Sequence, residues 1–416
     1  MKTILNNKFY SIDKKVGIEI KKENEFGEND LKLLNYSKLN SYKNIEAWTA
    51  LGTNQELGYF THGFFRYFGK FPPVIATYLI TEYTAPGDIV FDPMCGSGTT
   101  GVEAMYLGRK AFINDINDLS VLLSKVKTKH IDKEILSREL DNIKNNYKPL
   151  TFEEYSYEPV GLKNYKHWFL DKTCDSLRGL KKIIEDIKDI DVRNFFLANF
   201  CAIIRPVSRA TTQQGRLFLD VETAKEDALE SFLKKTIKNI EKIDSLVNNN
   251  DVFVLSKDIK EEIFPEVNKA KLIIMHPPYF NSYKYSSINS LELSWLGIDK
   301  SNFSKKEIRE FFKVGKAENV DRYVKDMFDS IDNMKEYLDK NGRIALMMGD
   351  TIIKNEYVPA TKLLLEKIEK DTNLVVEKVV LRIPKYTEAS WAASQRRKTN
   401  NIGVNINDFV IILKEK

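Results

Sequence analysis

Cysteine is scarce in this sequence, and long hydrophobic runs are missing from it. The 416 residues include three cysteines, Cys95, Cys174 and Cys201, which are odd in number and far apart. They therefore suggest neither a disulfide framework nor a zinc-ligand cluster. The N-terminus lacks the apolar stretch of a signal peptide, and no later apolar run approaches membrane-spanning length. These absences predict a cytoplasmic protein with no membrane partner and no bound metal.

The charges of the chain nearly balance. Lys and Arg outnumber Asp and Glu by 64 to 59, which gives a net charge of +5. This excess is compatible with a polyanionic partner but is too small to establish one. The composition, 43% hydrophobic and 30% charged, is typical of an ordinary globular protein. The length favours two structural units or one enlarged catalytic domain.

A strand, a glycine loop, a helix and a second strand follow one another in the first third of the chain. A Pro86-Gly87 turn precedes the apolar run 88–91, and a helix is expected from Thr99 to Leu107, ended by Gly108. A second strand is expected at 111–113. This order is a βαβ unit, which requires a parallel sheet and a right-handed crossover.

The rest of the chain divides by its apolar periodicity. Between about 132 and 248 the period changes from 2 to 3.6, which predicts helices whose apolar positions are Leu177, Leu180, Ile184, Ile187, Leu229, Leu233, Ile237, Ile240 and Val247. Strand-like runs then resume at 252–255, 272–275, 344–348, 379–381 and 409–413. We therefore expect an N-terminal extension (1–58), an α/β domain built from 59–124 and 251–416, and a helical insertion (125–250).

The glycine loop has the features of an adenosine-cofactor site. Gly96, Gly98 and Gly101 stand where a backbone must turn sharply and lie close to a ligand. Asp115 ends the next strand, where its carboxylate can accept hydrogen bonds from two ribose hydroxyls. The three glycines also satisfy the dinucleotide pattern G-x-G-x-x-G, so an NAD-dependent oxidoreductase remains an alternative at this point.

A second motif favours a methyltransferase. The apolar strand 272–275 runs into His276-Pro277-Pro278-Tyr279, which resembles the D/N/S-P-P-Y/F motif of the DNA amino-methyltransferases that act on cytosine N4 or adenine N6. The loop Asp92-Pro93-Met94-Cys95-Gly96-Ser97-Gly98-Thr99-Thr100 resembles the cofactor loop of that family, and the run from His62 to Pro73 resembles the segment before it. The resemblance covers roughly 59–124 and 251–416.

This resemblance implies a fold, a cofactor and a set of cofactor-binding residues. The implied fold is a Rossmann-like, seven-stranded, mostly parallel α/β sheet with an antiparallel C-terminal strand, and the implied cofactor is S-adenosyl-L-methionine. Asp115 would bind the ribose and Asp258 the adenine amine. The implied cofactor loop residues are Asp92, Pro93, Cys95, Gly96, Gly98, Thr99 and Thr100.

The Pro-Pro-Tyr motif suits chemistry on an exocyclic amine. Such an amine is a poor nucleophile because its lone pair is delocalised into the ring, so it needs acceptors that pull the nitrogen towards tetrahedral geometry. Pro277 and Pro278 fix the backbone and donate no competing N–H, and Tyr279 offers a flat face for an extruded base. His276 departs from the family pattern, but a neutral imidazole still accepts one hydrogen bond.

Two basic segments are candidates for binding double-stranded DNA. One contains Arg205, Arg209 and Arg216, and the other contains Arg396, Arg397 and Lys398. Arginine binds phosphates or reads guanine edges. The first segment lies in the helical insertion, which we take as the candidate target-recognition region. A cognate restriction endonuclease is a further expected partner.

Other readings of the motifs remain open. An RNA base methyltransferase acting on guanine N2 or adenine N6 shares the fold and a similar motif, and a protein methyltransferase can use Pro-Pro-Tyr on a glutamine amide. A non-catalytic DNA-binding module would require a vestigial cofactor loop, and nothing in the loop looks damaged. Asn281, Tyr285 and the run 291–297 resemble a segment of some cytosine-N4 enzymes, which gives a slight lean towards cytosine.

Overall fold

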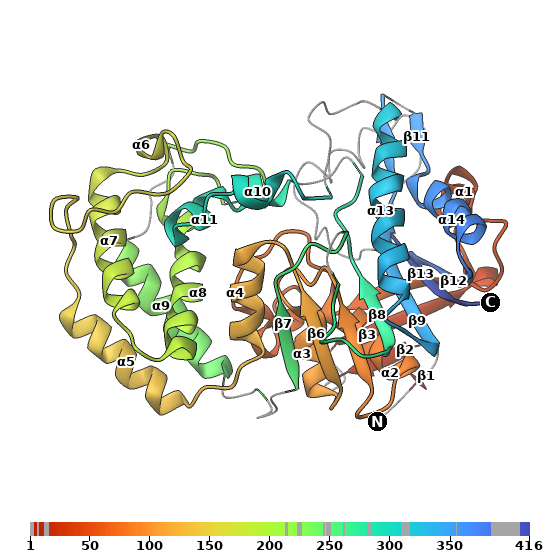
Figure 1. Cartoon of the computed structure of the whole chain (residues 1–416), viewed down its shortest axis with the longest axis horizontal. Coiled ribbons are helices and arrows are strands. Elements are labelled where there is room, and N and C mark those ends of the chain that lie inside the picture. Colours follow the sequence, from red (N-terminus) through yellow and green to blue (C-terminus); the bar gives the residue numbers. More distant parts are fainter. Residues whose placement is uncertain are drawn as a thin grey trace.

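One eleven-stranded sheet organises the computed structural model of the chain (Figure 1). Its strands lie in the order β1-β2-β3-β4-β12-β13-β9-β8-β5-β6-β7. The structure describes residues 4–5, 8–11, 16–212, 215–222, 227–243, 246, 251–260, 263–280, 284–308, 317–354, 356–383 and 408–416.

Seven of these strands form the sheet that the sequence predicts. β7, β6, β5, β8 and β9 are parallel to one another, whereas β13 pairs antiparallel with both β9 and β12. The bounds are β5 Ile89–Asp92, β6 Lys110–Asn114, β7 Val252–Leu255, β8 Ala270–Met275, β9 Leu338–Gly349, β12 Leu374–Arg382 and β13 Asp408–Glu415. The predicted fold class, including the antiparallel C-terminal strand, is therefore confirmed.

The N-terminal segment extends this sheet beyond β12. β4 (Ile45–Leu51) pairs parallel with β12, and β3 (Val16–Lys22) pairs antiparallel with β4. The backbones of β1 (Ile4–Leu5) and β2 (Lys8–Ser11) continue the order. The sequence analysis set this segment apart as an N-terminal extension, but Val16, Ile18 and Ile20 are buried at alternate positions of β3, with Gly17 and Glu19 between them. Three alternating positions are too few to stand out in a Lys- and Asn-rich sequence.

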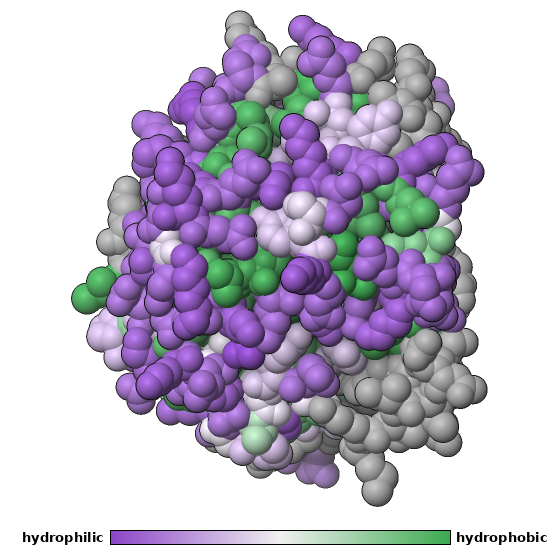
Figure 2. All heavy atoms as spheres, turned by 90° about the vertical axis from the view of Figure 1, so that its right-hand side faces the viewer, coloured by the Kyte–Doolittle hydropathy of each residue, from purple (hydrophilic) through white to green (hydrophobic). Residues whose placement is uncertain are grey.

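Helices cover both faces of the sheet. α2 (Pro73–Tyr83) and α3 (Thr99–Tyr106) share one apolar core with the sheet, and α1 (Glu28–Ser37), α13 (Val320–Lys335) and α14 (Ala360–Asp371) share the other. The face of the molecule on the side of α1 and α14 is largely hydrophilic, with apolar atoms in separate groups (Figure 2). These layers are the arrangement expected of a βαβ-based domain.

A second, all-helical core lies beside the β7 edge of the sheet (Figure 1). Its helices are α4 (Asp118–Lys127), α5 (Lys133–Asn146), α7 (Asp171–Glu185), α8 (Ile190–Val207), α9 (Ala228–Ile243) and α11 (Ser290–Leu296). The predicted apolar positions Leu177, Leu180 and Ile184 are fully buried in it. Ile237 was wrongly placed there: it is 51% exposed, because α9 turns Phe232, Thr236 and Ile240 inwards instead.

Short elements complete the described part of the chain. They are η1 Glu23–Glu25, η2 Glu56–Gly58, η3 Phe60–Gly63, α6 Tyr165–Trp168, α10 Tyr285–Ile288, α12 Ser301–Ser304, η4 Ala317–Asn319, β10 Thr351–Ile353 and β11 Glu356–Val358. Across the described ranges, every helix is too short or too polar to cross a membrane.

Candidate functional site

The glycine loop after β5 is shaped by two left-handed glycines. Gly96 has φ of 52° and Gly98 has φ of 76°, and Gly98 is the N-cap of α3. A Cβ on Gly98 would stand 2.9 Å from Ser124 Oγ and 3.1 Å from Ser124 Cα. The loop is therefore pressed against α4, and glycine is required at this position for both conformation and space.

Two buried carboxylates hold this loop in place. Asp92 accepts hydrogen bonds from the Thr100 hydroxyl and from the Met94 N–H (3.1 Å). Asp115, at the end of β6, accepts from the Gly96 N–H at 2.8 Å and from the Asn117 N–H at 2.8 Å. Burial raises the pKa of both carboxyls to about 7. Asp92 thus closes the loop on itself, and Asp115 joins the loop to the next strand.

A buried polar network supports the loop from behind. The Lys127 ammonium on α4 donates to the carbonyl oxygen of Ser97, and Lys127 is 1% exposed. Glu103 on α3 pairs with His62 (2.7 Å) and accepts from the hydroxyls of Tyr59 (2.8 Å) and Thr77. Burial raises the pKa of Glu103 to about 7 and lowers that of His62. Sequence reasoning missed this network because its members come from four separate segments.

On the other side of the site, Asn114 joins the loop after β5 to the segment that follows β7. Its side-chain amide donates to the carbonyls of Pro93 and Lys257, both at 3.0 Å, and its Oδ1 accepts from the Lys257 N–H. Asp258 follows directly and is 3% exposed, with Oδ1 accepting from the Lys260 N–H at 3.0 Å. The carboxyl ends of β5, β6 and β7 therefore place Asp258 beside the glycine loop.

The His-Pro-Pro-Tyr segment follows β8 at the same edge of the sheet. His276 Nε2 and the Tyr279 hydroxyl are 2.9 Å apart, and the two rings meet edge to face. Burial, and after it the charge of Arg382, lowers the pKa of His276 to about 3, so the imidazole is neutral at physiological pH. Tyr279 lies against Gly349 on β9, where a Cβ would stand 2.7 Å from its ring.

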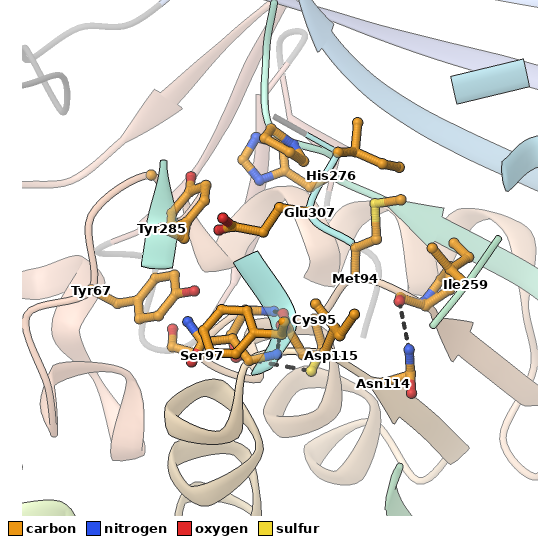
Figure 3. Close-up of a pocket in the computed structure, with 18 of the residues that line it drawn as sticks. Tyr67, Met94, Cys95, Ser97, Asn114, Asp115, Ile259, His276, Tyr285 and Glu307 are labelled. Atoms are coloured by element: carbon orange, nitrogen blue, oxygen red, sulfur yellow. Dashed lines mark hydrogen bonds between the residues drawn. The ribbon is translucent and has the colours of Figure 1, made fainter. Parts of the chain in front are cut away.

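One cavity brings these segments together (Figure 3). Six of the predicted cofactor-binding residues line it, namely Pro93, Cys95, Gly96, Thr99, Asp115 and Asp258. His276 and Pro278 line the same cavity, whereas Asp92, Gly98, Thr100, Pro277 and Tyr279 stand behind its wall. The cavity thus extends from the glycine loop to the Pro-Pro-Tyr segment.

Three lining residues escaped the sequence analysis as a group. Tyr67 and Tyr285 stack with ring centroids 5.9 Å apart and an interplanar angle of 12°. Glu307 accepts from the Ser286 N–H at 2.9 Å and from the Ser286 hydroxyl at 2.6 Å. Its carboxylate points into the space between Tyr67, Tyr285 and His276 (Figure 3). Tyr67 lies inside the segment that resembles the family, but nothing in the sequence pairs it with Tyr285.

The basic residues predicted to bind DNA have different surroundings. Arg205 is 6% exposed, and its guanidinium donates to the carbonyls of Thr211, Gly215 and Arg216 and lies 5.2 Å from the Phe68 ring centroid. These contacts correct our expectation for Arg205, because a buried side chain that holds its own loop does not reach a phosphate. Arg216 is exposed on that loop and Arg209 is half-buried. Arg396, Arg397, Lys398 and Asn281 lie outside the described residues.

The sheet order and the lining of the cavity agree with the methyltransferase class that the resemblance implies. A parallel sheet with an antiparallel strand between its last two members, and a glycine loop facing a Pro-Pro-Tyr segment, is the arrangement that the methyltransferase resemblance implies. Among the described residues, no group of His, Cys, Asp and Glu is arranged to hold a metal ion.

Comparison with known proteins agrees with this class. Residues 6–126 match the model of the DNA methylase family N6_N4_Mtase, and the match includes strands β2, β3 and β4, which lie outside the resemblance read from the sequence. The chain is 25% identical over 258 residues to the type II methyltransferase M.MvaI of Kocuria varians, covering 56% of this chain and 54% of the relative. It is 28% identical over 286 residues to M.BsoBI of Geobacillus stearothermophilus, covering 60% and 54%.

A third relative is matched over a longer stretch. The type II methyltransferase M.MjaII of Methanocaldococcus jannaschii is 24% identical over 391 residues, which cover 71% of this chain and 73% of the relative. The chain spans about half the length of the first two relatives. The family match and these relatives are a DNA methylase model and type II methyltransferases, and the chain is similar to them over the stretches given.

Proposed function

We propose that this protein transfers a methyl group from S-adenosyl-L-methionine to an exocyclic amine, cytosine N4 or adenine N6, of a base flipped out of double-stranded DNA. One observation carries the proposal: a single cavity is lined by the glycine loop and Asp115 at one end and by His276 and Pro278 at the other. A cofactor site and an acceptor site must adjoin for direct transfer between two bound molecules.

The residues present fit the cofactor. Gly98 makes room where a Cβ would collide with α4, and Asp115 adds a carboxylate at the end of β6, where ribose hydroxyls can donate to it. Asp258 is placed to accept from an adenine amine, and the loop from Gly96 to Thr100 would hold the methionine end. When bound, S-adenosyl-L-methionine supplies an electrophilic methyl group.

The protein's own contribution to the reaction is to position the amine. His276 acts as an acceptor if Nε2 carries the proton and donates to the Tyr279 oxygen, because Nδ1 then keeps its lone pair. The depressed pKa of His276 keeps that lone pair free of a second proton. The Pro277 carbonyl is the proposed second acceptor, and Tyr279 the proposed stacking face. Two acceptors on one amine would draw its lone pair out of conjugation.

The domain roles and the partners follow from this function as further proposals. The helices between 125 and 250 would recognise the DNA sequence, and residues 59–124 with 251–416 would carry out catalysis. Arg209 and Arg216 would contact the duplex. A restriction endonuclease of matching specificity would be the cellular partner.

Radiolabelled methyl transfer tests the proposal. The full chain is incubated with labelled S-adenosyl-L-methionine and either duplex DNA or RNA, and the product is digested to nucleosides. Calorimetry measures binding of NAD and of S-adenosyl-L-methionine. We expect label in N4-methylcytosine or N6-methyladenine. His276→Ala should lower the rate on the order of 10²-fold, and His276→Asn should recover part of it by restoring an acceptor. Label in RNA only, saturable NAD binding without any response to S-adenosyl-L-methionine, or a wild-type rate in His276→Ala would contradict the mechanism.

A further inference from the structure

A second cavity lies near the first. It lies between the segment 65–68, helix α8 and helix α11, and it is lined by Phe65, Arg66, Phe68, Arg205, Asn289 and Glu292. Nothing in the proposed methyl transfer uses it.

Two buried side chains that line this cavity each have one polar atom without a hydrogen-bond partner among the described residues. Asn289 is 5% exposed and Glu292 is 4% exposed, and they stand one turn apart. Within the described part of the chain, Asn289 Nδ2 and Glu292 Oε2 have no hydrogen-bond partner. Buried polar groups are nearly always paired in native proteins, so an unpaired donor and an unpaired acceptor on one cavity wall indicate a ligand.

The charge of Glu292 is only partly compensated. Burial raises the pKa of its carboxyl to about 7, and Arg205 opposes this shift. Arg205 itself is directed to the carbonyls of its own loop. Within the described part of the chain, Oε2 of Glu292 therefore remains available to accept from an N–H group of a ligand.

The two cavities are lined by residues that are neighbours in sequence. Tyr67 lines the first cavity, while its neighbours Arg66 and Phe68 line the second. On the other wall, the Asn289 N–H donates to the carbonyl of Tyr285 at 3.0 Å, and Tyr285 lines the first cavity. A ligand of the second cavity would thus lie next to whatever occupies the first.

We propose that the second cavity binds one unpaired nucleobase of the DNA substrate, next to the base that receives the methyl group. This inference rests on the proposed function. Every base carries an N–H donor beside an acceptor on its Watson–Crick edge, which matches the Glu292 acceptor and the Asn289 donor. Arg66 is exposed and lines the cavity; its Nη1 donates to the Thr212 carbonyl, and its other guanidinium donors would bind the phosphate of that nucleotide.

Binding of bulged duplexes tests this site separately from methyl transfer. The probes are a labelled duplex with one unpaired base and the same duplex with an abasic residue at that position. The full chain carries Tyr279→Ala, which impairs the first cavity, and is saturated with S-adenosylhomocysteine. Fluorescence anisotropy should show about tenfold tighter binding of the base-containing probe. Adding Glu292→Met, or in a second variant Asn289→Leu, should reduce this ratio to about one.

Thermal melting distinguishes a ligand site from a structural one. Each substitution replaces an unpaired buried polar group by an apolar side chain, so the melting temperature should stay level or rise. A ratio near one in Tyr279→Ala alone, or an unchanged ratio in both added variants, overturns the second base site and points to water in the cavity. Wild-type protein is assayed for methyl transfer in parallel. If methyl transfer is absent but the ratio of the two probe affinities is intact, the proposed function is contradicted and the base site is not.

Discussion

The hydroxyl of Tyr323 donates a hydrogen bond to the carbonyl oxygen of Pro278 at 3.0 Å. Tyr323 is 1% exposed on α13, and burial raises its pKa, so it remains a donor. The contact anchors the Pro-Pro-Tyr backbone to a helix that lies 45 residues further along the chain. Because this hydrogen bond uses the Pro278 carbonyl, the Pro277 carbonyl is the one proposed to accept a hydrogen bond from the target amine.

Removing this anchor should slow methyl transfer. We expect Tyr323→Phe to lower kcat several-fold and to cost about 1 kcal/mol of unfolding free energy, the typical contribution of one hydrogen bond. The KM for the cofactor should not change, because the glycine loop is untouched. Tyr42→Phe is the control, since its hydroxyl donates to Glu369 at 3.1 Å on the far helix α14. Equal kcat in the two variants would show that the anchor has no catalytic effect.

A methyl group at Gly98 should abolish cofactor binding. Its Cβ would stand 3.1 Å from the Ser124 Cα, and its φ of 76° is unfavourable for any other residue. Gly108→Ala is a matched control, because Gly108 has φ of 70° but nothing within 4 Å of the added Cβ. Calorimetry with S-adenosylhomocysteine should show binding lost in Gly98→Ala and kept in Gly108→Ala. Similar losses in both variants would attribute the effect to backbone strain alone.

Cofactor affinity should fall as the pH drops below about 7. Burial raises the pKa of Asp115 to about 7, so acidification protonates the carboxylate that would accept hydrogen bonds from the ribose. If only the charged form binds, the dissociation constant rises about tenfold per pH unit below that value. Calorimetry with S-adenosylhomocysteine between pH 5.5 and about 8 measures this slope.

The Asp115→Asn variant controls for other groups. This variant should bind S-adenosylhomocysteine weakly at every pH, and its affinity should lose most of the pH dependence. Asp92 also has a pKa of about 7, but it should contribute little to that dependence because its oxygens accept hydrogen bonds within the loop. A slope equal to that of the wild type would assign the titration to Asp92 or to another group.

Arg205 and Arg216 should differ in what they stabilise. Arg205→Ala removes three charge-assisted hydrogen bonds from a buried loop, so we expect a loss of roughly 2–3 kcal/mol in unfolding free energy. Arg216→Ala should leave the melting temperature unchanged, lower duplex affinity and reduce the salt slope by about 1. Denaturant unfolding and salt-dependent anisotropy measure the two effects. An unchanged slope in Arg216→Ala would remove that residue from the DNA interface.

Local sequence patterns were sufficient for the central sheet and for the motifs at its edge. Short apolar runs form β5, β6, β7, β8 and β13 and the predicted parts of β9 and β12. Each motif stands directly after a strand, so neighbours in sequence are neighbours in space. Parallel strands end at one edge, which is why Gly96, Asp115, Asp258 and His276 could be expected near one another. Their individual roles stay predictions.

The tertiary structure alone decided which distant residues meet. Tyr67, Tyr285 and Glu307 come from three loops whose meeting depends on how the helical core packs against the sheet. The same packing buries Arg205, which the sequence shows only as a basic residue in a polar loop, and pairs Lys127 with the glycine loop. Composition and spacing record what a side chain can do chemically. Burial and long-range contacts determine which of those abilities it keeps, because desolvation fixes both its charge and its available partners.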